Sequence, residues 1–418
     1  MIRNTKAVRP EYGDRFRCIG PACEDTCCAG WQVDIDKDTF TKYQSISAGP
    51  LRELIDANIA RVPPGAAGEK PSSFARVKLL PTMGCPFHNA EGLCQIQVEK
   101  GESYLSLTCA TYPRVTVVID KLTDQTLSFS CPEVCRLVLL DPDVFSSGSA
   151  GIHFMPWDDA THDPSLLSYF WPIREFTIGL IKNRTYPLWQ RMFLLGTFSR
   201  RLEAVIRGEV KGGFAAMLNG FSSAVATGSL RASIETIPAD LTLQLGMVME
   251  LVKMRAEQAL QAPRLFECID AFTKGIGYVE GATLEHMSAE YGAAYERYFA
   301  PFFDRNPHIL ENYLINMIFR RMTPVGNPQK NTPSHRPSAP DPVKEFALLA
   351  TEFALLKGLL IGVAGGFKES FSAEHVVQTV QSVSKRFEHD QEFPKRVYRI
   401  LADKKLDNAH GLTMLLRN

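Results

Sequence analysis

The sequence concentrates its thiols in the first third of the chain. Of ten cysteines, nine lie between residues 18 and 135, and the tenth is Cys268. The nine are Cys18, Cys23, Cys27, Cys28, Cys85, Cys94, Cys109, Cys131 and Cys135. Cysteines that serve only as small buried apolar side chains would be spread over the whole core. The clustering therefore predicts that these sulfur atoms meet, either as disulfides or as thiolate ligands of a metal.

The choice between disulfides and metal depends on the compartment in which the protein folds. The segment Met1 to Arg17 carries five basic residues and no apolar run, so it does not resemble a secretory signal. Disulfides persist in oxidising compartments and are rare in the cytoplasm. We therefore expect a cytoplasmic protein whose cysteines bind metal. A disulfide-linked scaffold, which would need export, is the less favoured alternative.

The cysteine spacing bears on the kind of metal. The pattern is C-x4-C-x3-C-C, then C-x8-C, a single Cys109, and C-x3-C, and no pair has the ordinary zinc-ribbon spacing. Nine thiols exceed one tetrahedral site, and all-sulfur surroundings also suit an iron-sulfur cluster held by about four cysteines. The spacing is compatible with either zinc or an iron-sulfur cluster. The thiols that do not bind this metal would hold a second site or stay free. His88, inside the C-x8-C loop, is a further candidate ligand, whereas Cys268 is expected to be a core residue.

A predicted hairpin would bring the later cysteines together. Residues 115–119 and 126–130 are rich in β-forming residues on either side of a polar segment. With residue 119 opposite 126, Arg114 would lie opposite Cys131, which returns Cys131 to the neighbourhood of Cys109. The proline that follows Cys131 suits the first turn of a helix.

The remainder of the chain is predicted to be helical. Apolar residues recur at helical spacing beyond about residue 140, most clearly at residues 306–322. We therefore expect a mainly α fold, with a small α+β cysteine-rich metal domain at residues 1–145 and a helical domain at residues 146–418. A segment rich in proline and serine, residues 324–342, is predicted to be a mobile loop.

Charge and hydropathy narrow the classes of partner. Lysine plus arginine equals aspartate plus glutamate at 46 each, so no net field attracts nucleic acid or anionic lipid. The most apolar segment, residues 346–364, contains Glu352 and Lys357, which argues against a membrane span. We expect a protein that binds neither nucleic acid nor membranes.

No segment has the pattern that cradles a nucleotide cofactor in a doubly wound sheet. That site needs a strand, a Gly-x-Gly turn and a helix in succession. Gly358, Gly362, Gly365 and Gly366 lie in or just after an apolar helical pattern, where they would allow close helix packing or end the helix. A Rossmann-like fold is therefore not expected, and the C-x3-C-x2-C triplet of radical enzymes is also missing from the sequence.

Taken together, these motifs resemble the flagellin lysine-N-methylase family. The resemblance rests on Cys18 to Trp31, Cys85-Pro-Phe, Gly92-Leu-Cys94, Thr108 to Arg114, and Ser130 to Cys135. The stretch Leu310 to Tyr313 before an Arg-Arg pair is also similar. The N-terminal part looks like the broader iron- or zinc-chelating cysteine-cluster domains.

The resemblance implies transfer of methyl groups from S-adenosylmethionine to surface lysines of flagellin. It also implies a cysteine-bound iron-sulfur cluster of the 4Fe-4S type, with zinc as the alternative. The ligands carried over are Cys23, Cys27, Cys28, Cys85, Cys94 and Cys109, with Cys18, Cys131 and Cys135 as further candidates. The alternative function is a metal-stapled binding or adaptor protein without catalysis.

Methyl transfer to an amine needs a neutral lysine, so the site requires desolvation or a group that takes a proton. Tyr112 is the candidate acceptor, and Arg114 is the candidate partner of the cofactor carboxylate through a bidentate pair. In the helical part, the segment Glu311 to Tyr313 supplies Tyr313 as a second catalytic candidate. The alternatives are a structural role for Tyr112 and Arg114 beside Cys109, and a packing role for Tyr313.

Overall fold

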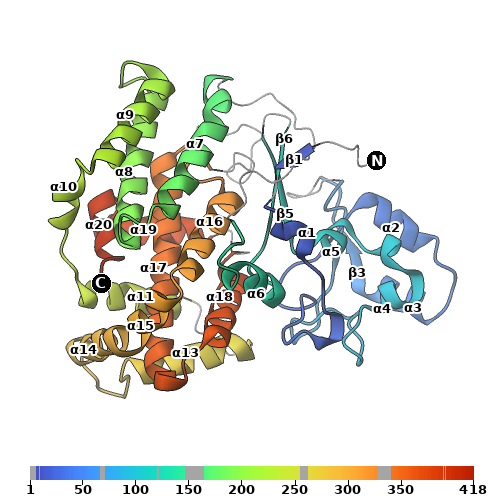
Figure 1. The fold of residues 1–418 in the computed structure, drawn as a ribbon. Coiled ribbons are helices and arrows are strands. Elements are labelled where there is room, and N and C mark those ends of the chain that lie inside the picture. The colour runs from blue at the N-terminus through green and yellow to red at the C-terminus, as the bar shows by residue number, and fades with distance from the viewer. Residues whose placement is uncertain are drawn as a thin grey trace.

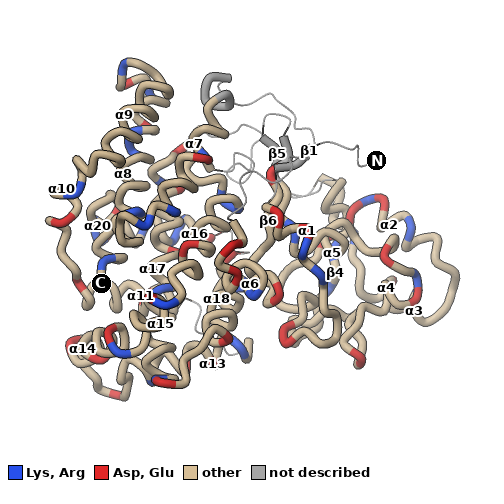
Figure 2. Tube along the Cα trace, in the orientation of Figure 1, with Lys and Arg blue, Asp and Glu red and all other residues tan. Residues whose placement is uncertain are grey.

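The computed structural model describes residues 6–8, 10–65, 71–119, 122–145, 164–254, 262–326, 340–388, 390 and 392–418. The protein is mainly α-helical, as the sequence predicts. In Figure 1 a large helical body occupies one side of the molecule, and the blue and teal elements of the N-terminal part occupy the other. Figure 2 shows basic and acidic residues interspersed over both parts, in keeping with their equal numbers.

The N-terminal part consists of short elements around a core of its own. Its helices are α1 (Tyr12–Arg15), η1 (Gly20–Ala22), α2 (Lys37–Gln44), α3 (Pro50–Asn58), α4 (Gln95–Lys100), η2 (Glu102–Tyr104) and α5 (Leu107–Thr111). A small antiparallel sheet has the order β2 (Asp34–Ile35), β4 (Ala75–Val77), β3 (Ile59–Arg61). Ile35, Tyr43, Leu51 and Ile96 are buried together here. Because this apolar cluster is separate from that of the helical body, it stabilises the region by its own burial.

A second sheet connects the N-terminus to the predicted hairpin. β1 (Lys6–Val8) pairs in parallel with β6 (Leu122–Leu127). β6 in turn pairs antiparallel with β5 (Arg114–Ile119). The hairpin lies where the N-terminal part meets the helical body (Figure 1).

The hairpin is present, but its predicted register is wrong. Arg114 lies opposite Leu127 and not opposite Cys131. The reason is that the polar segment expected to form a long turn is itself most of the second strand. Asp124 of this strand is buried and pairs with Arg174 of the helical body at 2.9 Å. A charge that suggested a turn therefore belongs to an interior ion pair.

The helical body is built from consecutive helices of varied length. They are α6 (Pro132–Leu139), α7 (Pro164–Lys182), α8 (Leu188–Ile206), α9 (Gly213–Thr227), α10 (Arg231–Glu235), α11 (Leu241–Lys253), α13 (Pro263–Gly275), α14 (Leu284–Ala294), the π-helix η3 (Tyr295–Phe299), α15 (Ala300–Arg305), α16 (His308–Arg321), α17 (Pro342–Phe367), η4 (Lys368–Ser370), α18 (Ala373–Phe387), α19 (Phe393–Asp403) and α20 (Ala409–Met414). Pro132 opens α6 as predicted.

α17 runs through the core of the helical body. In the described part of the chain, one helical stretch, Pro342–Ser370, is long and apolar enough to cross a membrane, and 94% of its apolar window is buried inside the protein. Glycine brings α17 against α13, because a Cβ added to Gly275 would lie 1.7 Å from the carbonyl oxygen of Gly362. This close approach confirms the packing role predicted for the α17 glycines.

The core of the helical body also contains residues that precede position 145 in the sequence. Leu127 and Phe129 are buried in it, and the Tyr12 hydroxyl donates to the side-chain oxygen of Asn316 in α16. The division into a domain of residues 1–145 and another of residues 146–418 stays a prediction.

The described residues do not test two further predictions, the mobile loop and the absence of a Rossmann-like fold. The mobile loop predicted at 324–342 lies outside the described residues from residue 327 to residue 339. The described strands form two three-stranded sheets. That the chain lacks a Rossmann-like fold stays a prediction.

Candidate thiol centre and adjoining pocket

Four cysteine side chains share one neighbourhood in the N-terminal part. We call Cys28, Cys85, Cys94 and Cys109 the primary thiol group. Burial raises the pKa of Cys85 to about 12 and that of Cys109 to about 11, and the nearby thiols add to both shifts. Since these effects link every pair in the group, the four sulfur atoms lie within electrostatic reach of one another.

Backbone hydrogen bonds bring the segments of this group together. The N–H of Cys85 donates to the carbonyl of Cys28 at 2.7 Å. In the loop between Cys85 and Cys94, a backbone bridge joins His88 to Cys94, and the Asn89 side chain accepts the Leu93 N–H at 2.8 Å. The turn formers of this segment therefore produce a tight loop that brings Cys85 and Cys94 close together.

Cys28 differs from its neighbours in its ionisation. The Cys27 thiol donates a hydrogen bond to the Cys28 sulfur, which lowers the pKa of Cys28. A hydrogen bond from Thr26 and the charges of His88 and Lys385 add to this shift. Because the thiolate is the form that binds metal, Cys28 is the member of the group best prepared to do so. His88, the candidate histidine ligand, lies beside it.

Cys27 lies beside the primary thiol group, since both Cys28 and Cys109 influence its ionisation. Cys18, Cys23 and Cys131 form a second neighbourhood, in which Cys18 influences the ionisation of Cys23 and both influence that of Cys131. Cys135 is buried in the helical core, donates to the carbonyl of Phe129 at 3.1 Å, and has a pKa that burial raises well above its ordinary value. It is therefore a neutral core thiol in this structure.

The primary thiols are neighbours without forming a single-ion site. In the described residues, no three histidine, cysteine or acidic side chains are arranged to hold one metal ion. A zinc site needs four ligands that converge on one point. An iron-sulfur cluster takes each thiolate on a different iron atom, so its thiols surround it at a distance from one another.

The helical body holds the loop that carries the first cysteines. On α18, the Lys385 ammonium lies 2.8 Å from the Asp25 carboxylate and also donates to the Thr26 carbonyl at 2.9 Å. Gln381 donates to the same carboxylate at 2.6 Å. Sequence reasoning missed these contacts, because nothing in the local pattern links residues so far apart.

A pocket of about 360 Å³ adjoins the primary thiol group. Tyr112 and Arg114, both predicted as site residues, line it together with Trp31, Ser128 and Arg320. The rings of Trp31 and Tyr112 stack at 5.7 Å with an interplanar angle of 29°. The lining also includes Thr108 and Thr111, on either side of Cys109 in α5. The structure thus brings Tyr112 and Arg114 into one site beside the thiols.

A buried carboxylate lies behind this pocket. Glu388 is 5% exposed, pairs with Arg320 at 2.9 Å, and accepts the Ser128 hydroxyl at 2.7 Å through the same oxygen. Its other oxygen is buried and has no hydrogen-bond partner among the described residues. The sequence gives no signal for Glu388, since it lies 260 residues from Ser128.

The candidates from α16 do not reach the pocket. Tyr313 is buried in the helical core, stacked between Phe129 at 5.5 Å and Phe353 at 6.2 Å. Glu311 pairs with Arg191 at 2.7 Å, and the Asn312 amide donates to carbonyls after α6 and within it. These contacts match the packing role that was the alternative for Tyr313.

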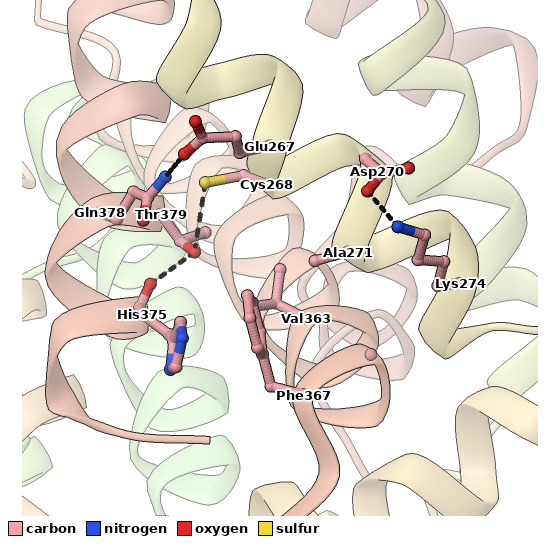
Figure 3. A pocket seen from close by; sticks show the side chains of 11 residues that line it. Glu267, Cys268, Asp270, Ala271, Lys274, Val363, Phe367, His375, Gln378 and Thr379 are labelled. Atoms are coloured by element: carbon pink, nitrogen blue, oxygen red, sulfur yellow. Dashed lines mark hydrogen bonds and ion pairs between the residues drawn. The ribbon is translucent and has the colours of Figure 1, made fainter. Parts of the chain in front are cut away.

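A second pocket, of about 330 Å³, lies between α13, α17 and α18 (Figure 3). Its polar groups are bonded to one another. Gln378 donates to Glu267 at 2.6 Å, and Lys274 pairs with Asp270 at 2.6 Å. Cys268 is buried at its edge, where it accepts the Thr379 hydroxyl at 3.7 Å, in agreement with the core role expected for it. This pocket therefore offers a ligand little unpaired polarity.

Comparison with known proteins found a family model and several relatives that match the chain. The sequence model of the FliB lysine N-methylase C-terminal domain matches residues 174–415. A lysine-N-methylase of Salmonella typhimurium is 22% identical over 408 residues, which cover 95% of this chain and 96% of that protein. The flagellar biosynthetic protein FliU of Salmonella muenchen is 31% identical over 148 residues, covering 35% of this chain and 85% of that protein. No solved structure matches the chain.

Proposed function

Because the chain belongs to the FliB lysine N-methylase family, we propose that it is a protein-lysine N-methyltransferase that moves methyl groups from S-adenosylmethionine to surface lysines of flagellin. The relatives named lysine-N-methylase support the reaction. The relative named as a flagellar biosynthetic protein supports the flagellar substrate.

One observation carries the proposal, namely the composition of the pocket beside the primary thiol group. The stacked rings of Trp31 and Tyr112 offer a flat face for a purine and attract a positively charged sulfonium. The guanidinium groups of Arg114 and Arg320 line the same pocket and suit a carboxylate. S-Adenosylmethionine carries all three groups, and a volume of about 360 Å³ lies within the range of small-molecule sites.

An iron-sulfur cluster fits the donor set of the primary thiol group. Cys28, Cys85, Cys94 and Cys109 supply four thiols within electrostatic reach of one another, and no three of them are arranged around one ion in the described residues. This favours a cluster of the 4Fe-4S type over zinc. When bound, the cluster would be held by these four thiolates and would tie their loops together beside the pocket.

The residues of the pocket would prepare the amine for attack. The lysine nitrogen forms a bond to the methyl carbon as the bond from that carbon to sulfur breaks, and the sulfur keeps the electron pair. The amine must be neutral for this step, although a free lysine is protonated near neutral pH. Tyr112 is the aromatic group in the pocket that can accept a hydrogen bond from the lysine and exclude water around it, while Asp34 adds a carboxylate to the same lining.

The test is incubation of the anaerobically purified protein with flagellin and S-adenosylmethionine labelled in its methyl group. We expect label on flagellin lysines by mass spectrometry, together with bound iron. Flagellin binding without any transfer of label would contradict the enzyme and favour the metal-stapled adaptor.

A further inference from the structure

Four side chains form a continuous hydrogen-bonded chain behind the pocket. The Tyr112 hydroxyl lies 3.0 Å from that of Ser130, and the Ser130 hydroxyl lies 2.7 Å from that of Ser128. The Ser128 hydroxyl donates to a carboxylate oxygen of Glu388 at 2.7 Å. Tyr112 and Ser128 also line the pocket, whereas Ser130 and Glu388 are buried behind it. The chain therefore leads from the pocket to a carboxylate in the interior.

The direction of these hydrogen bonds follows from the number of hydrogens available. Each hydroxyl has one hydrogen, and a carboxylate has none to donate. Ser128 uses its hydrogen on Glu388, so Ser130 must donate to Ser128. Ser130 then has none left, so Tyr112 must donate to Ser130. This leaves a lone pair of the Tyr112 oxygen as the acceptor at the outer end of the chain.

The inner end of the chain has room for a proton. Glu388 binds Ser128 and Arg320 through one oxygen, while its second oxygen is buried and unbonded among the described residues. A buried acceptor without a donor is costly in free energy. Arg320 contacts the oxygen that Ser128 also bonds, so a proton that arrives on the second oxygen of Glu388 leaves the guanidinium contact in place.

We propose that the chain from Tyr112 through Ser130 and Ser128 to Glu388 carries away the proton that a substrate lysine loses before it is methylated. This inference rests on the proposed function. The ammonium gives a proton to the Tyr112 oxygen as Tyr112 passes its own to Ser130, Ser130 to Ser128, and Ser128 to Glu388. The lysine becomes a neutral amine, Glu388 becomes a carboxylic acid, and each hydroxyl keeps one hydrogen. After the product leaves, the proton returns along the same chain to water in the pocket.

The buried phenol and thiol groups near this chain keep their protons. Burial raises the pKa of Tyr112 well above its ordinary value, so the phenol passes a proton on without ionising first. Tyr313 and Cys135, which face Glu388, also have pKa values that burial raises well above their ordinary ones. Burial raises the pKa of Cys131, which faces Tyr112, to about 12. Cys27 faces Tyr112 as well, and its bond to Cys28 raises its pKa.

The test compares Glu388→Gln, Ser130→Ala and Tyr112→Phe with the unmodified protein, each checked for iron content and bound methyl donor. We expect each change to lower methyl transfer to flagellin roughly 100-fold near pH 7, the size of a general-base contribution. In each variant the rate should then rise about tenfold per pH unit up to about pH 9, because only lysine that is already neutral can react. If Glu388→Gln kept the rate and the pH profile of the unmodified protein, the proposed proton path to Glu388 would be wrong.

A second measurement tests the proton-carrying chain from Tyr112 to Glu388 without requiring methyl transfer. We place 3-fluorotyrosine at position 112 and record its ¹⁹F resonance without substrate. Glu388→Gln and Ser130→Ala should both move this resonance, because they remove the polarised chain that ends on the phenol. Glu352→Gln, which alters another buried carboxylate paired with arginine, should leave both the resonance and the pH profile unchanged. If the resonance does not respond to Glu388→Gln, the proposed proton path is wrong even when the enzyme is active. If the resonance responds but the protein transfers no methyl group, only the proposed function is wrong.

Discussion

The Lys385 ammonium lies 2.8 Å from the Asp25 carboxylate, although 360 positions separate the two residues in the sequence. Both side chains are mostly buried, with exposed fractions of 10% and 21%. The pair fixes the loop from Cys23 to Cys28 on the surface of α18. The geometry of the primary thiol group therefore depends on the helical body as well as on the cysteines.

Lys385→Met should loosen this loop and lower the bound metal. Removing one partner of a largely buried pair leaves the Asp25 charge without compensation, which costs roughly 2–4 kcal/mol of unfolding free energy. Thermal unfolding and metal analysis measure the two effects. Lys274→Met is the matched control, because its pair with Asp270 is exposed at 68% and 45% and should contribute less than about 1 kcal/mol. Equal metal content in both variants would show that the ion pair between Lys385 and Asp25 is not needed to hold the metal-binding loop.

Cys109→Ala and Cys94→Ala should each lose metal and methyl transfer together. Both residues belong to the primary thiol group, and a cluster held by four thiolates loses a ligand with either change. Iron analysis and visible absorption of anaerobically purified protein measure the loss. Cys268→Ala is the control, since Cys268 is buried far along the chain beside Thr379 and should keep full metal content. Full metal in the first two variants would show that the ligands lie elsewhere.

Arg114→Met should weaken the binding of S-adenosylmethionine about tenfold, because it removes a charge-assisted hydrogen bond to the carboxylate. The side chain also lies over the Phe16 ring at 5.6 Å, so methionine keeps part of the packing. Calorimetric titration with S-adenosylmethionine measures the change. Arg207→Met, in an exposed pair with Glu203 on α8, is the control. Unchanged affinity in the Arg114 variant would leave that residue with the structural role only.

The stability of the protein should depend on Lys357 in alkaline solution. Burial lowers the pKa of Lys357 to about 7, whereas a lysine in the unfolded chain has a pKa of about 10.4. Between these values the unfolded chain binds the proton and the folded protein does not, so the free energy of unfolding gains a contribution that rises with pH. Lys357→Met removes that contribution. Melting temperatures from about pH 6 to pH 10 should thus rise less in Lys357→Met than in the unmodified protein.

Lys253→Met is the control for this comparison, because Lys253 is exposed at the end of α11. Its melting temperatures should follow those of the unmodified protein at every pH. A Lys357→Met curve that also runs parallel to them would show that Lys357 keeps an ordinary pKa.

Local sequence patterns predicted much of the architecture. Helical spacing identified α16, the glycines of α17 were assigned to close packing, and Pro132 was placed at the start of α6. The hairpin register failed, since polarity was taken as the sign of a turn, whereas Asp124 is neutralised by Arg174 from a distant helix. A partner of that kind cannot be seen in a window of neighbouring residues.

Some residues of the candidate site could likewise be predicted from the local sequence, and others could not. Tyr112 and Arg114 were found because they lie shortly after Cys109 in the sequence, and the structure places both in the adjoining pocket. Glu388 and Lys385 were missed, because each reaches the site from a helix that starts far along the chain. Tyr313 lay on an apolar stripe, and its burial between two phenylalanines agrees with the packing alternative.

The contact between Asp25 and Lys385 joins a segment made early in synthesis to one made near its end. A ribosome that has made all nine clustered cysteines has still to add α18 before their first loop gains its anchor. Loading with metal should therefore be a late event, which follows release of nearly the whole polypeptide. A truncated product that retains every one of these thiols but ends before α18 would be a poor recipient for iron.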